Sequence, residues 1–542
     1  GKITMLPLGG LGAIGMNNML IGCDGHWLML DAGVMFPDKR CPGIDLVLPS
    51  LDVLDRLEGE FHGVVLTHGH EDHIGSLPFV RKRHDVRIWG TRFTLGLVRA
   101  RFAEHDLDVS CLRETTPGEH LKLGPFDIDF LRVTHSIPDC VSLAIRTPVG
   151  NVLFTGDFKI DAGLPCGTRF DEAGYRAFGD EGVLLLLADS TNIQRNGRTI
   201  SEEVVAGGLR EAIAEAPGRV FIGLFSSNLY RLHSVLAAAR ATGRKVCLLG
   251  RSLHKYLQVA SEWGGNLDFS GPFVSESALG SYEDHELLFV CTGTQGEPRA
   301  ALGRIANGMH RVKVHNEDTL LLSSRAIPGN LREIHEMIDG FTRAGAHVFH
   351  RNPPWPIHAS GHAARDELED VLRWVRPKIF APVHGTRTFL EDHADLGEDC
   401  GVKRVCVFEN GDLLQVDQDG AQVLDKIPLE AWYYDGMHVG TRETLGVRQR
   451  ADLAWHGAIA VSVSMGDEPT QVRLDTRGVF TDGGRLESEL KETIVPYLDR
   501  LEILDNDALR EEVRLFTRRF FKRATGKKPQ VMASLFRKPG AA

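Results

Sequence analysis

Short apolar runs separated by glycine-rich turns fill the first part of the chain, residues 1–202. Each run is only a few residues long, and few segments between them have helical spacing, so the runs are interpreted as strands. Two sheets with helices on their outer sides would bury such strands, which predicts a layered α/β fold. The predicted strands are Ile3–Leu8, Met19–Ile21, Trp27–Asp31, Val64–Thr67, Ile128–Val133, Ser142–Arg146, Val152–Thr155 and Val183–Ala188.

The next part of the chain alternates helical and strand-like segments regularly. Glu202–Glu215 and Leu229–Ala241 have the spacing of helices, whereas Arg219–Leu224 and Lys245–Leu249 are apolar and short. Regular alternation of this kind is typical of a parallel sheet covered by helices. We therefore expect a second α/β layer system inserted after the first.

The last part of the chain predicts a small α+β unit. A strand at Ala458–Met465 and helices at Leu486–Leu501 and Asp507–Lys522 follow an expected linker at Thr444–Arg450. No group of chemistry-bearing residues occurs in this unit, so its apolar faces are expected to pack against another subunit. Seven basic residues crowd near its end and indicate either a solvated helix face or a contact with RNA or a subunit. They are Arg514, Arg518, Arg519, Lys522, Arg523, Lys527 and Lys528.

Composition narrows the class of protein. The chain has 542 residues, 42% of them hydrophobic and 25% charged, which indicates a globular protein of several domains. Its net charge of −11 argues against a surface covered in basic patches but allows a local basic groove for nucleic acid. No apolar run approaches the roughly 20 residues that cross a bilayer, so no membrane partner is expected. Nine dispersed cysteines without C-x-x-C pairs predict reduced thiols and a cytoplasmic location.

A histidine-rich motif follows one of the predicted strands. The apolar run Gly63–Thr67 is followed directly by His68, His70, Asp72 and His73 in an H-x-H-x-D-H arrangement. Imidazole nitrogens and carboxylate oxygens are the ligands that suit zinc or manganese. Glu71, between them, is expected to be exposed. The motif predicts half of a site for two metal ions.

Further ligand-type residues stand at the carboxyl ends of other predicted strands. His135, Asp157, His384 and Asp31 each follow an apolar run, where the loops of an α/β sheet build sites. Two ions about 3.5–4 Å apart would need a shared ligand and would make hydroxide available at neutral pH. The expected division is His68, His70 and His135 on one ion, Asp72, His73 and His384 on the other, Asp157 as the bridge, and Asp31 orienting imidazoles. Zn²⁺ and Mn²⁺ share these ligand types, so either is expected.

These motifs together resemble a known family. H-x-H-x-D-H is a signature of the metallo-β-lactamase fold, and the inserted βα segment resembles the β-CASP domain of its nucleic-acid-cleaving members. The whole chain is similar to the ribonuclease J family. The segments that carry this resemblance are Pro7–Asn17, Ala188–Asn192, Phe225–Asn228, Thr292–Gly296, Ser323–Asn330, His358–His362, Pro382–Thr386 and Arg519–Gly526. Two small departures are Ala359, where a branched residue is expected, and Arg325, where a smaller one is common.

The resemblance implies a fold and domain limits. The fold is α/β: a metallo-β-lactamase αββα sandwich with an inserted β-CASP α/β domain and a small α+β C-terminal domain. The implied limits are 1–202 and 363–443 for the two parts of the sandwich, 203–362 for the β-CASP domain and 444–542 for a C-terminal oligomerisation domain. A homodimer or homotetramer is implied, together with partner proteins of RNA decay.

The resemblance also implies an activity: a 5′→3′ exoribonuclease with some endoribonuclease activity that prefers 5′-monophosphorylated single-stranded RNA and acts in RNA decay and maturation. Asp72 and His362 are the expected catalytic residues, with His362 donating a proton to the leaving oxygen, binding phosphate, or both. A pocket for the terminal phosphate is expected from small donors and backbone amides. Its expected residues are Ser227, Asn228, His358, Ala359, Ser360, Gly361 and His362.

Two other functions remain open at this stage. A hydrolase of small thioesters or lactams would share the metal motif but predicts a shorter chain without the βα insertion. A non-enzymatic RNA-binding scaffold would have lost metal ligands, whereas every expected ligand is present here. Metal content and cleavage of RNA would distinguish the three functions.

Overall fold

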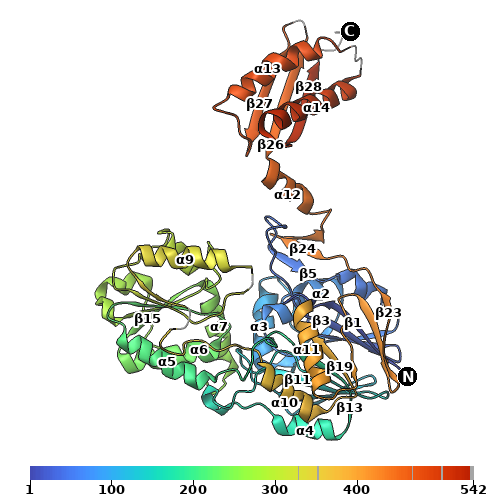
Figure 1. Ribbon diagram of the computed structural model, residues 1–542, viewed down its shortest axis with the longest axis vertical. Coiled ribbons are helices and arrows are strands. Elements are labelled where there is room, and N and C mark those ends of the chain that lie inside the picture. The colour runs from blue at the N-terminus through green and yellow to red at the C-terminus, as the bar shows by residue number, and fades with distance from the viewer. Residues whose placement is uncertain (328, 351–352, 467, 502–504, 538–542) are drawn as a thin grey trace. The chain divides into compact units, whose positions relative to one another are not determined.

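The computed structural model describes residues 1–327, 329–350, 353–466, 468–501 and 505–537. Pro328 of the segment Ser323–Asn330 therefore lies outside the described residues. The chain forms two compact units, Gly1–Met35 with Pro49–Leu429, and Phe36–Leu48 with Glu430–Ala542 (Figure 1). Among the described residues, no helix combines the length and the apolar character needed to cross a membrane.

Two large sheets form the main part of the first unit. The first has eight strands in the order β23 (Gly420–Lys426), β22 (Asp412–Asp417), β1 (Ile3–Gly9), β3 (Asn18–Cys23), β4 (His26–Leu30), β6 (Glu60–Val65), β7 (Arg87–Thr91) and β8 (Leu112–Thr115). The second has seven strands in the order β21 (Arg404–Val405), β19 (Ile379–Val383), β13 (Val183–Asp189), β12 (Asn151–Phe154), β11 (Val141–Arg146), β10 (Phe126–Arg132) and β9 (His120–Leu123).

The two sheets share one hydrophobic core. Side chains from both, such as Ile21 and Leu28 from the first and Phe130 and Leu185 from the second, are buried in a single cluster. Helices cover the outer sides, as the apolar pattern predicts: α3 packs on β7, α4 on β13 and α11 on β19. The helices of this region are α1 (Glu71–Ile74), α2 (Leu77–Arg83), α3 (Arg92–Ala103), α4 (Glu172–Asp180), α10 (Arg365–Val375) and α11 (Arg387–Asp399).

The predicted βα alternation is confirmed by a five-stranded parallel sheet. Its strand order is β15 (Lys245–Leu249), β16 (Leu287–Cys291), β14 (Val220–Gly223), β17 (Thr319–Leu322) and β18 (His347–Phe349). The helices are α5 (Glu202–Glu215), α6 (Leu229–Thr242), α7 (Arg251–Trp263), α8 (Ala301–Ala306) and α9 (Leu331–Arg343), with α9 on one face and α5 and α6 on the other (Figure 1). Phe221, Phe289 and Phe341 fill its core, with the rings of Phe221 and Phe289 stacked 4.5 Å apart.

The second unit contains two small sheets. One joins β5 (Leu46–Leu48), β24 (Trp432–Asp435) and β25 (His438–Thr441), so the segment 36–48 belongs to this unit by strand pairing. The other has the order β27 (Gln471–Arg477), β26 (Ala458–Met465) and β28 (Gln530–Arg537). Helices α13 (Arg485–Leu498) and α14 (Asn506–Thr525) share a core with this sheet.

Some predicted elements were wrong in detail. The expected linker Thr444–Arg450 overlaps α12 (Val447–His456), which begins after Gly446 in a left-handed conformation. The strands β27 and β28 were not predicted. In β27 the exposed positions are charged or polar and the alternate residues are only partly buried, and in β28 the exposed positions include the apolar residues Met532 and Phe536, which break the alternation of apolar and polar residues. The short helix α1, which was not predicted, begins at Glu71 within the histidine motif, so Asp72 and His73 lie in its first turn.

Candidate metal centre

The structure brings all of the expected metal ligands to one edge of the two large sheets. His68 follows β6, His135 follows β10, Asp157 follows β12 and His384 follows β19 directly. Because β12, β13 and β19 are parallel neighbours, their carboxyl ends open into the same loops. The backbone of His384 has a φ of 54°, in the left-handed region that ordinary residues avoid, which is typical of side chains held for function.

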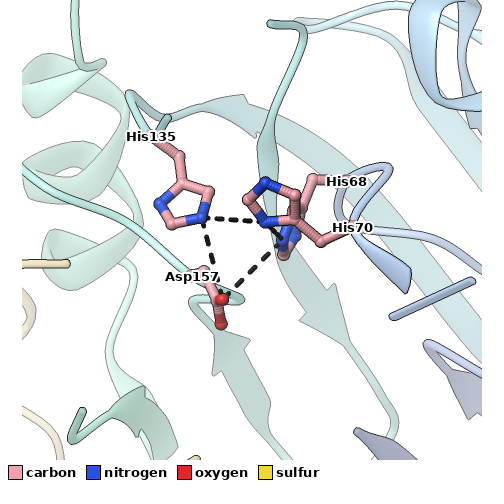
Figure 2. Close-up of side chains that lie close together, drawn as sticks. All are labelled: His68, His70, His135 and Asp157. Atoms are coloured by element: carbon pink, nitrogen blue, oxygen red, sulfur yellow. Dashed lines mark hydrogen bonds and ion pairs between the residues drawn. The ribbon is translucent and has the colours of Figure 1, made fainter. Parts of the chain in front are cut away.

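The first donor cluster consists of His68, His70, His135 and Asp157 (Figure 2). His70 Nδ1 lies 3.1 Å from His68 Nε2 and 3.2 Å from His135 Nε2. Asp157 Oδ2 lies 3.7 Å from His68 Nε2 and 3.8 Å from His135 Nε2. Tetrahedral ligands with bonds of about 2.0–2.1 Å stand about 3.4 Å apart, so these donor atoms are spaced as ligands of one zinc-sized ion.

The second donor cluster consists of Asp72, His73, Asp157 and His384. His73 Nε2 lies 3.3 Å from Asp157 Oδ2 and 3.7 Å from Asp72 Oδ2. His384 Nε2 lies 3.6 Å from Asp72 Oδ2, and its Nδ1 lies 3.2 Å from Asp157 Oδ1. Asp157 therefore belongs to both clusters, as expected of a bridging carboxylate.

Hydrogen bonds behind the clusters fix the imidazole rings. Buried Asp31 accepts His73 Nδ1–H at 2.8 Å and also the backbone N–H and hydroxyl of Thr67, each at 2.8 Å. Thr67 in turn accepts His68 Nδ1–H at 2.9 Å, and the Gly361 carbonyl accepts His135 Nδ1–H at 2.6 Å. Each of these rings thus presents Nε2 with its lone pair to the cluster. Asp31 contacts the imidazole of His73 directly and that of His68 only through Thr67, a residue that the sequence interpretation missed.

Electrostatics separate the two donor clusters. Burial lowers the pKa of His68 and His135, and that of His70 to about 4, so the first cluster presents neutral imidazoles. Burial also opposes the charged forms of His73 and His384, but nearby carboxylates outweigh it, those of Asp157 and Asp72 for His73 and those of Asp157, Asp189 and Asp72 for His384. They raise the pKa of His73 well above its usual range and the pKa of His384 to about 10. The second cluster therefore attracts positive charge.

Two buried polar atoms in the clusters have no hydrogen-bond partner among the described residues. They are Asp157 Oδ1 and His384 Nε2. A buried polar atom without a hydrogen bond costs about 1–3 kcal/mol, so such atoms are typical of residues that bind a ligand. Together with the donor spacing, they show that these residues fit a pair of divalent cations.

Asp189 is a site residue that the sequence interpretation missed. It ends β13, and its Oδ2 accepts His362 Nδ1–H at 2.7 Å while its Oδ1 lies 3.1 Å from His384 Nδ1. Thr191 donates to the same Oδ1 from its backbone and its hydroxyl. Burial lowers the pKa of His362, but the carboxylates of Asp189 and Asp157 outweigh it and raise the pKa overall. Its place at a strand end, within a segment already singled out, was the signal available.

Of the residues expected to bind phosphate, five lie in the loop 357–362 and the other two, Ser227 and Asn228, precede α6. Ser360 Oγ accepts the His362 N–H at 3.1 Å, and Gly361 lies so close to His135 that an added Cβ would stand 2.8 Å from its ring. Asn228 is partly used elsewhere, because its side-chain oxygen caps α6 by accepting the Arg231 N–H at 3.0 Å. His358 Nε2 is buried without a partner among the described residues. Ala359 is buried and Ser227 is half-buried.

A buried ion network lies beside this loop and was also missed. We define the ion network as Lys159, Asp161, Glu202 and Arg231, all buried. Arg231 Nε and Nη2 donate to the two oxygens of Glu202, each at 2.9 Å, and Lys159 Nζ lies 3.2 Å from Glu202 and 2.9 Å from Asp161.

The same guanidinium also holds the loop that precedes His362. Arg231 donates to Ser323 Oγ at 2.5 Å and to the carbonyls of Ile357 and Ala359 at 3.5 and 3.4 Å. The ion network therefore ties the β-CASP-like sheet to the strand end that carries Asp157.

Two side chains near the site differ from expectation or from the usual pattern. Glu71 is half-buried rather than exposed, because its carboxylate pairs with Arg101 at 3.2 Å. Arg325 donates to Asn192 Oδ1 at 3.1 Å, so the larger residue at this position is hydrogen-bonded within the site's surroundings.

Comparisons with known proteins agree with this architecture. Residues 12–192 match the metallo-β-lactamase superfamily, 217–341 the ribonuclease J β-CASP domain, 356–406 the Zn-dependent metallo-hydrolase RNA specificity domain and 445–537 the ribonuclease J C-terminal domain. Ribonuclease J of Sinorhizobium meliloti is 37% identical over 98% of this chain and 96% of its own length. Ribonuclease J of Thermus thermophilus is 35% identical over 98% of this chain and 94% of its own length.

A solved structure supports the fold alone. A protein of unknown function from Enterococcus faecalis superposes with a TM-score of 0.54 and 16% identity, over 77% of this chain and all of that one. The fold and the donor clusters define a metal-dependent hydrolase of the metallo-β-lactamase superfamily, with β-CASP and C-terminal domains as expected. Within that class, the chain belongs to the ribonuclease J family and is a metal-dependent ribonuclease that binds divalent cations and acts on RNA.

Proposed function

We propose that the protein is a 5′→3′ exoribonuclease with endoribonuclease activity that prefers 5′-monophosphorylated single-stranded RNA. It would act in mRNA decay and in rRNA maturation in the cytoplasm, with other RNA-decay proteins as partners. The observation that carries the proposal is the pair Asp189–His362 standing beside two donor clusters that share Asp157. An acid on one side and ligands for two cations on the other are what hydrolysis of a phosphodiester needs.

The donor clusters are proposed as the two metal sites, in the division expected from the sequence. His68, His70 and His135 would bind one Zn²⁺ or Mn²⁺, and Asp72, His73 and His384 the other, with Asp157 shared. When bound, the two cations would activate water and offset the charge that develops on the phosphate. Asp31 and Thr67 would keep Nε2 of His73 and His68 directed at the cations.

His362 is proposed as the proton donor to the leaving group. Water attack forms a new P–O bond and breaks the bond between phosphorus and O3′, which then needs a proton. His362 Nδ1–H is held by Asp189 at 2.7 Å, so its Nε2 is the atom free to give that proton. The products would be a nucleoside 5′-monophosphate and an RNA with a new 5′-phosphate.

The loop 357–362 is proposed to receive the terminal phosphate. Ser227, Asn228, His358, Ala359, Ser360, Gly361 and His362 would line the pocket, as expected from the resemblance. The unpartnered Nε2 of His358 supports this, because a buried imidazole nitrogen requires a ligand or costs stability. Arg231 would act on the loop's position rather than on the phosphate, since Glu202 already neutralises it.

End-labelled RNA tests the proposal. One RNA sequence carrying a 5′-monophosphate, a 5′-triphosphate or a 5′-hydroxyl is digested by metal-loaded protein, and products are followed with time. We expect mononucleotides released from the 5′ end, fastest from the monophosphate. Release from the 3′ end, or equal rates for all three ends, would contradict the proposed polarity and end preference.

The C-terminal region is proposed to make the protein a homodimer or homotetramer. Its small sheet is partly exposed, with Met532 and Phe536 on β28 60% and 62% exposed. Removal of residues 444–542 should give monomers by light scattering, and a truncated protein that stayed dimeric would contradict this role.

A further inference from the structure

A cavity lies in the β-CASP domain. It has a volume of about 770 Å³ and opens at the edge strand β15 of the five-stranded sheet. None of the residues that line it belongs to the donor clusters, the loop 357–362 or the ion network. Its volume falls within the range of about 300–1,000 Å³ that is usual for small-ligand sites. The side chains that matter here are Leu248, Leu257, Phe273, Arg304, His310 and Arg311.

The lining of the cavity includes apolar side chains, among them one exposed aromatic ring. Phe273 is 43% exposed, and Leu248 and Leu257 beside it are half-buried. The backbone around Phe273 is anchored to β15, because Val246 N–H donates to the Pro272 carbonyl at 3.0 Å and Val274 N–H donates to the Val246 carbonyl at 2.9 Å. An exposed ring on an anchored backbone is a platform on which a nucleobase can stack without prior ordering.

The lining also includes two arginines and the imidazole of His310, with Glu276 as its one acidic residue. Arg304 and Arg311 are both exposed, and His310 lies between them in the chain. Burial lowers the pKa of His310, Arg304, Lys313 and Arg311 lower it further, and Glu276 alone opposes them. The chain as a whole has a net charge of −11, so the positive potential at this cavity is local and does not follow from the overall charge.

His310 adds a neutral hydrogen-bond donor to the two arginines of the lining. His310 Nδ1 accepts the Val312 N–H at 3.1 Å, so the hydrogen of the neutral ring is on Nε2. Two guanidinium groups and one imidazole N–H suit the oxygens of a phosphate.

We infer that this cavity binds a nucleoside 5′-monophosphate unit, with the base stacked on Phe273 and the phosphate held by Arg304 and Arg311. The inference rests on the proposed function, because the proposed reaction releases nucleoside 5′-monophosphates. The same chemical unit occurs as a free product and as a nucleotide of an RNA strand. In either case the protein has a second nucleotide site that is separate from the metal centre.

Photolabelling of the full-length, metal-loaded protein tests this. 8-Azidoadenosine 5′-monophosphate is added over a concentration series, irradiated, and the labelled peptides are identified by mass spectrometry. We expect saturable labelling of the segment 271–277, with half-saturation shifted about tenfold or more upward in an Arg304→Ala, Arg311→Ala double variant. Phe273→Ala should also weaken labelling, by about fivefold or more, since base–aromatic stacking is lost.

Arg332→Ala, which removes an exposed arginine of α9 in the same domain, is the matched control and should leave labelling unchanged. All variants should keep the wild-type circular dichroism spectrum and metal content, which shows that they are folded and that the metal centre is intact, and Arg332→Ala should also cleave a short RNA at the wild-type rate. Labelling confined to the loop 357–362, or equal labelling of 271–277 in wild type and double variant, would overturn the inference. The proposed function fails separately, if no variant and no wild type cleaves RNA.

Two competing ligands distinguish a free nucleoside monophosphate from a nucleotide of an RNA strand. Unlabelled AMP should displace the probe in all cases if the site is real. A ten-nucleotide RNA made uncleavable by 2′-O-methyl groups should displace it at lower concentration than AMP if the site holds a strand, and at higher concentration if it holds free mononucleotide. Failure of both competitors to reduce the labelling of 271–277 would overturn the inference.

Discussion

The donor clusters and the ion network are both buried groups of ionisable side chains, yet they are satisfied to different degrees. In the ion network, the guanidinium of Arg231 meets both oxygens of Glu202, and Lys159 meets both Glu202 and Asp161. In the donor clusters, nitrogens with lone pairs face one another at 3.1–3.2 Å, and Asp157 Oδ1 and His384 Nε2 have no hydrogen-bond partner among the described residues.

The difference separates structural polarity from chemical polarity. Buried charges that complete one another's hydrogen bonds hold segments together and need nothing further. Buried nitrogen and oxygen atoms whose lone pairs point at one position need a ligand there to be stable, and these residue types suit a cation. The predictions below test this distinction, from the largest expected effect to the smallest.

Substitution in the first donor cluster should remove activity and leave stability nearly intact. His70→Ala is expected to lower the RNA cleavage rate at least ~10⁴-fold, because one of two activating cations would lose a ligand. Metal analysis should show fewer than two ions per chain, with an unchanged circular dichroism spectrum. His285→Ala, at an exposed histidine, is the control. Near-normal turnover of His70→Ala would refute the metal assignment.

Substitution in the ion network should have the opposite profile. Arg231→Ala leaves the carboxylate of Glu202 buried with only Lys159 as partner, and loss of one member of a buried pair costs about 3–5 kcal/mol. Urea unfolding should show this loss, whereas Arg332→Ala, at an exposed ion pair, should change stability by less than about 1 kcal/mol. Metal content of folded Arg231→Ala should stay normal. A stability equal to wild type would mean that the network is not what joins these segments.

Asp189 should behave as part of the chemistry although it is as buried as the ion network. Asp189→Asn keeps the shape but removes the charge that holds the proton on His362, so cleavage is expected to fall about 10²–10³-fold. On the alkaline side of the rate–pH profile, the cleavage rate should begin to fall at a lower pH than in wild type. The reason is that the pKa of His362 falls and the ring loses its proton earlier. Metal content should be measured in parallel, because Asp189 also contacts His384. An unchanged profile would assign Asp189 a structural role only.

The smallest effect concerns acid stability. Burial opposes ionisation of Glu202, but Arg231 and Lys159 outweigh it and lower the pKa of Glu202 from 4.5 to about 2. A carboxylate with a lowered pKa stabilises the fold above the unfolded value near 4.5, and this contribution disappears as the pH falls towards 2. Between pH 5.5 and 3.5, metal-free wild type should therefore lose about 1 kcal/mol more than Glu202→Gln. Glu203→Gln, at an exposed neighbour, should match wild type.

The sequence predicted which side chains come together in the donor clusters, because the rule that places them is local. Each expected ligand follows an apolar strand, and the carboxyl ends of neighbouring parallel strands meet, so His135, Asp157 and His384 were brought to the histidine motif by topology alone. Asp189 obeys the same rule at the end of β13 but was passed over, because a carboxylate after a strand is common and its partner His362 is far away in sequence.

The ion network could not be predicted in the same way. Lys159, Glu202 and Arg231 are separated by many residues and look like ordinary surface charges, and only tertiary packing shows that they are buried together. The strands β27 and β28 were missed for a related reason. The inner side chains of β27 are only partly buried, and exposed Met532 and Phe536 put apolar residues on the outer face of β28, so the alternation that marks a strand is weak in both.

The loop segment around Gly361 has two roles, because its carbonyl positions His135 and its neighbours are proposed to bind RNA. This carbonyl accepts the hydrogen of His135 Nδ1, while its neighbours in the chain are those proposed to grip the RNA terminus. Anything that shifts this stretch must also tilt a histidine that would hold a cation. Such coupling is reciprocal. Binding of the RNA terminus would strengthen binding of the cation, and removal of the cation by a chelator would weaken binding of the RNA.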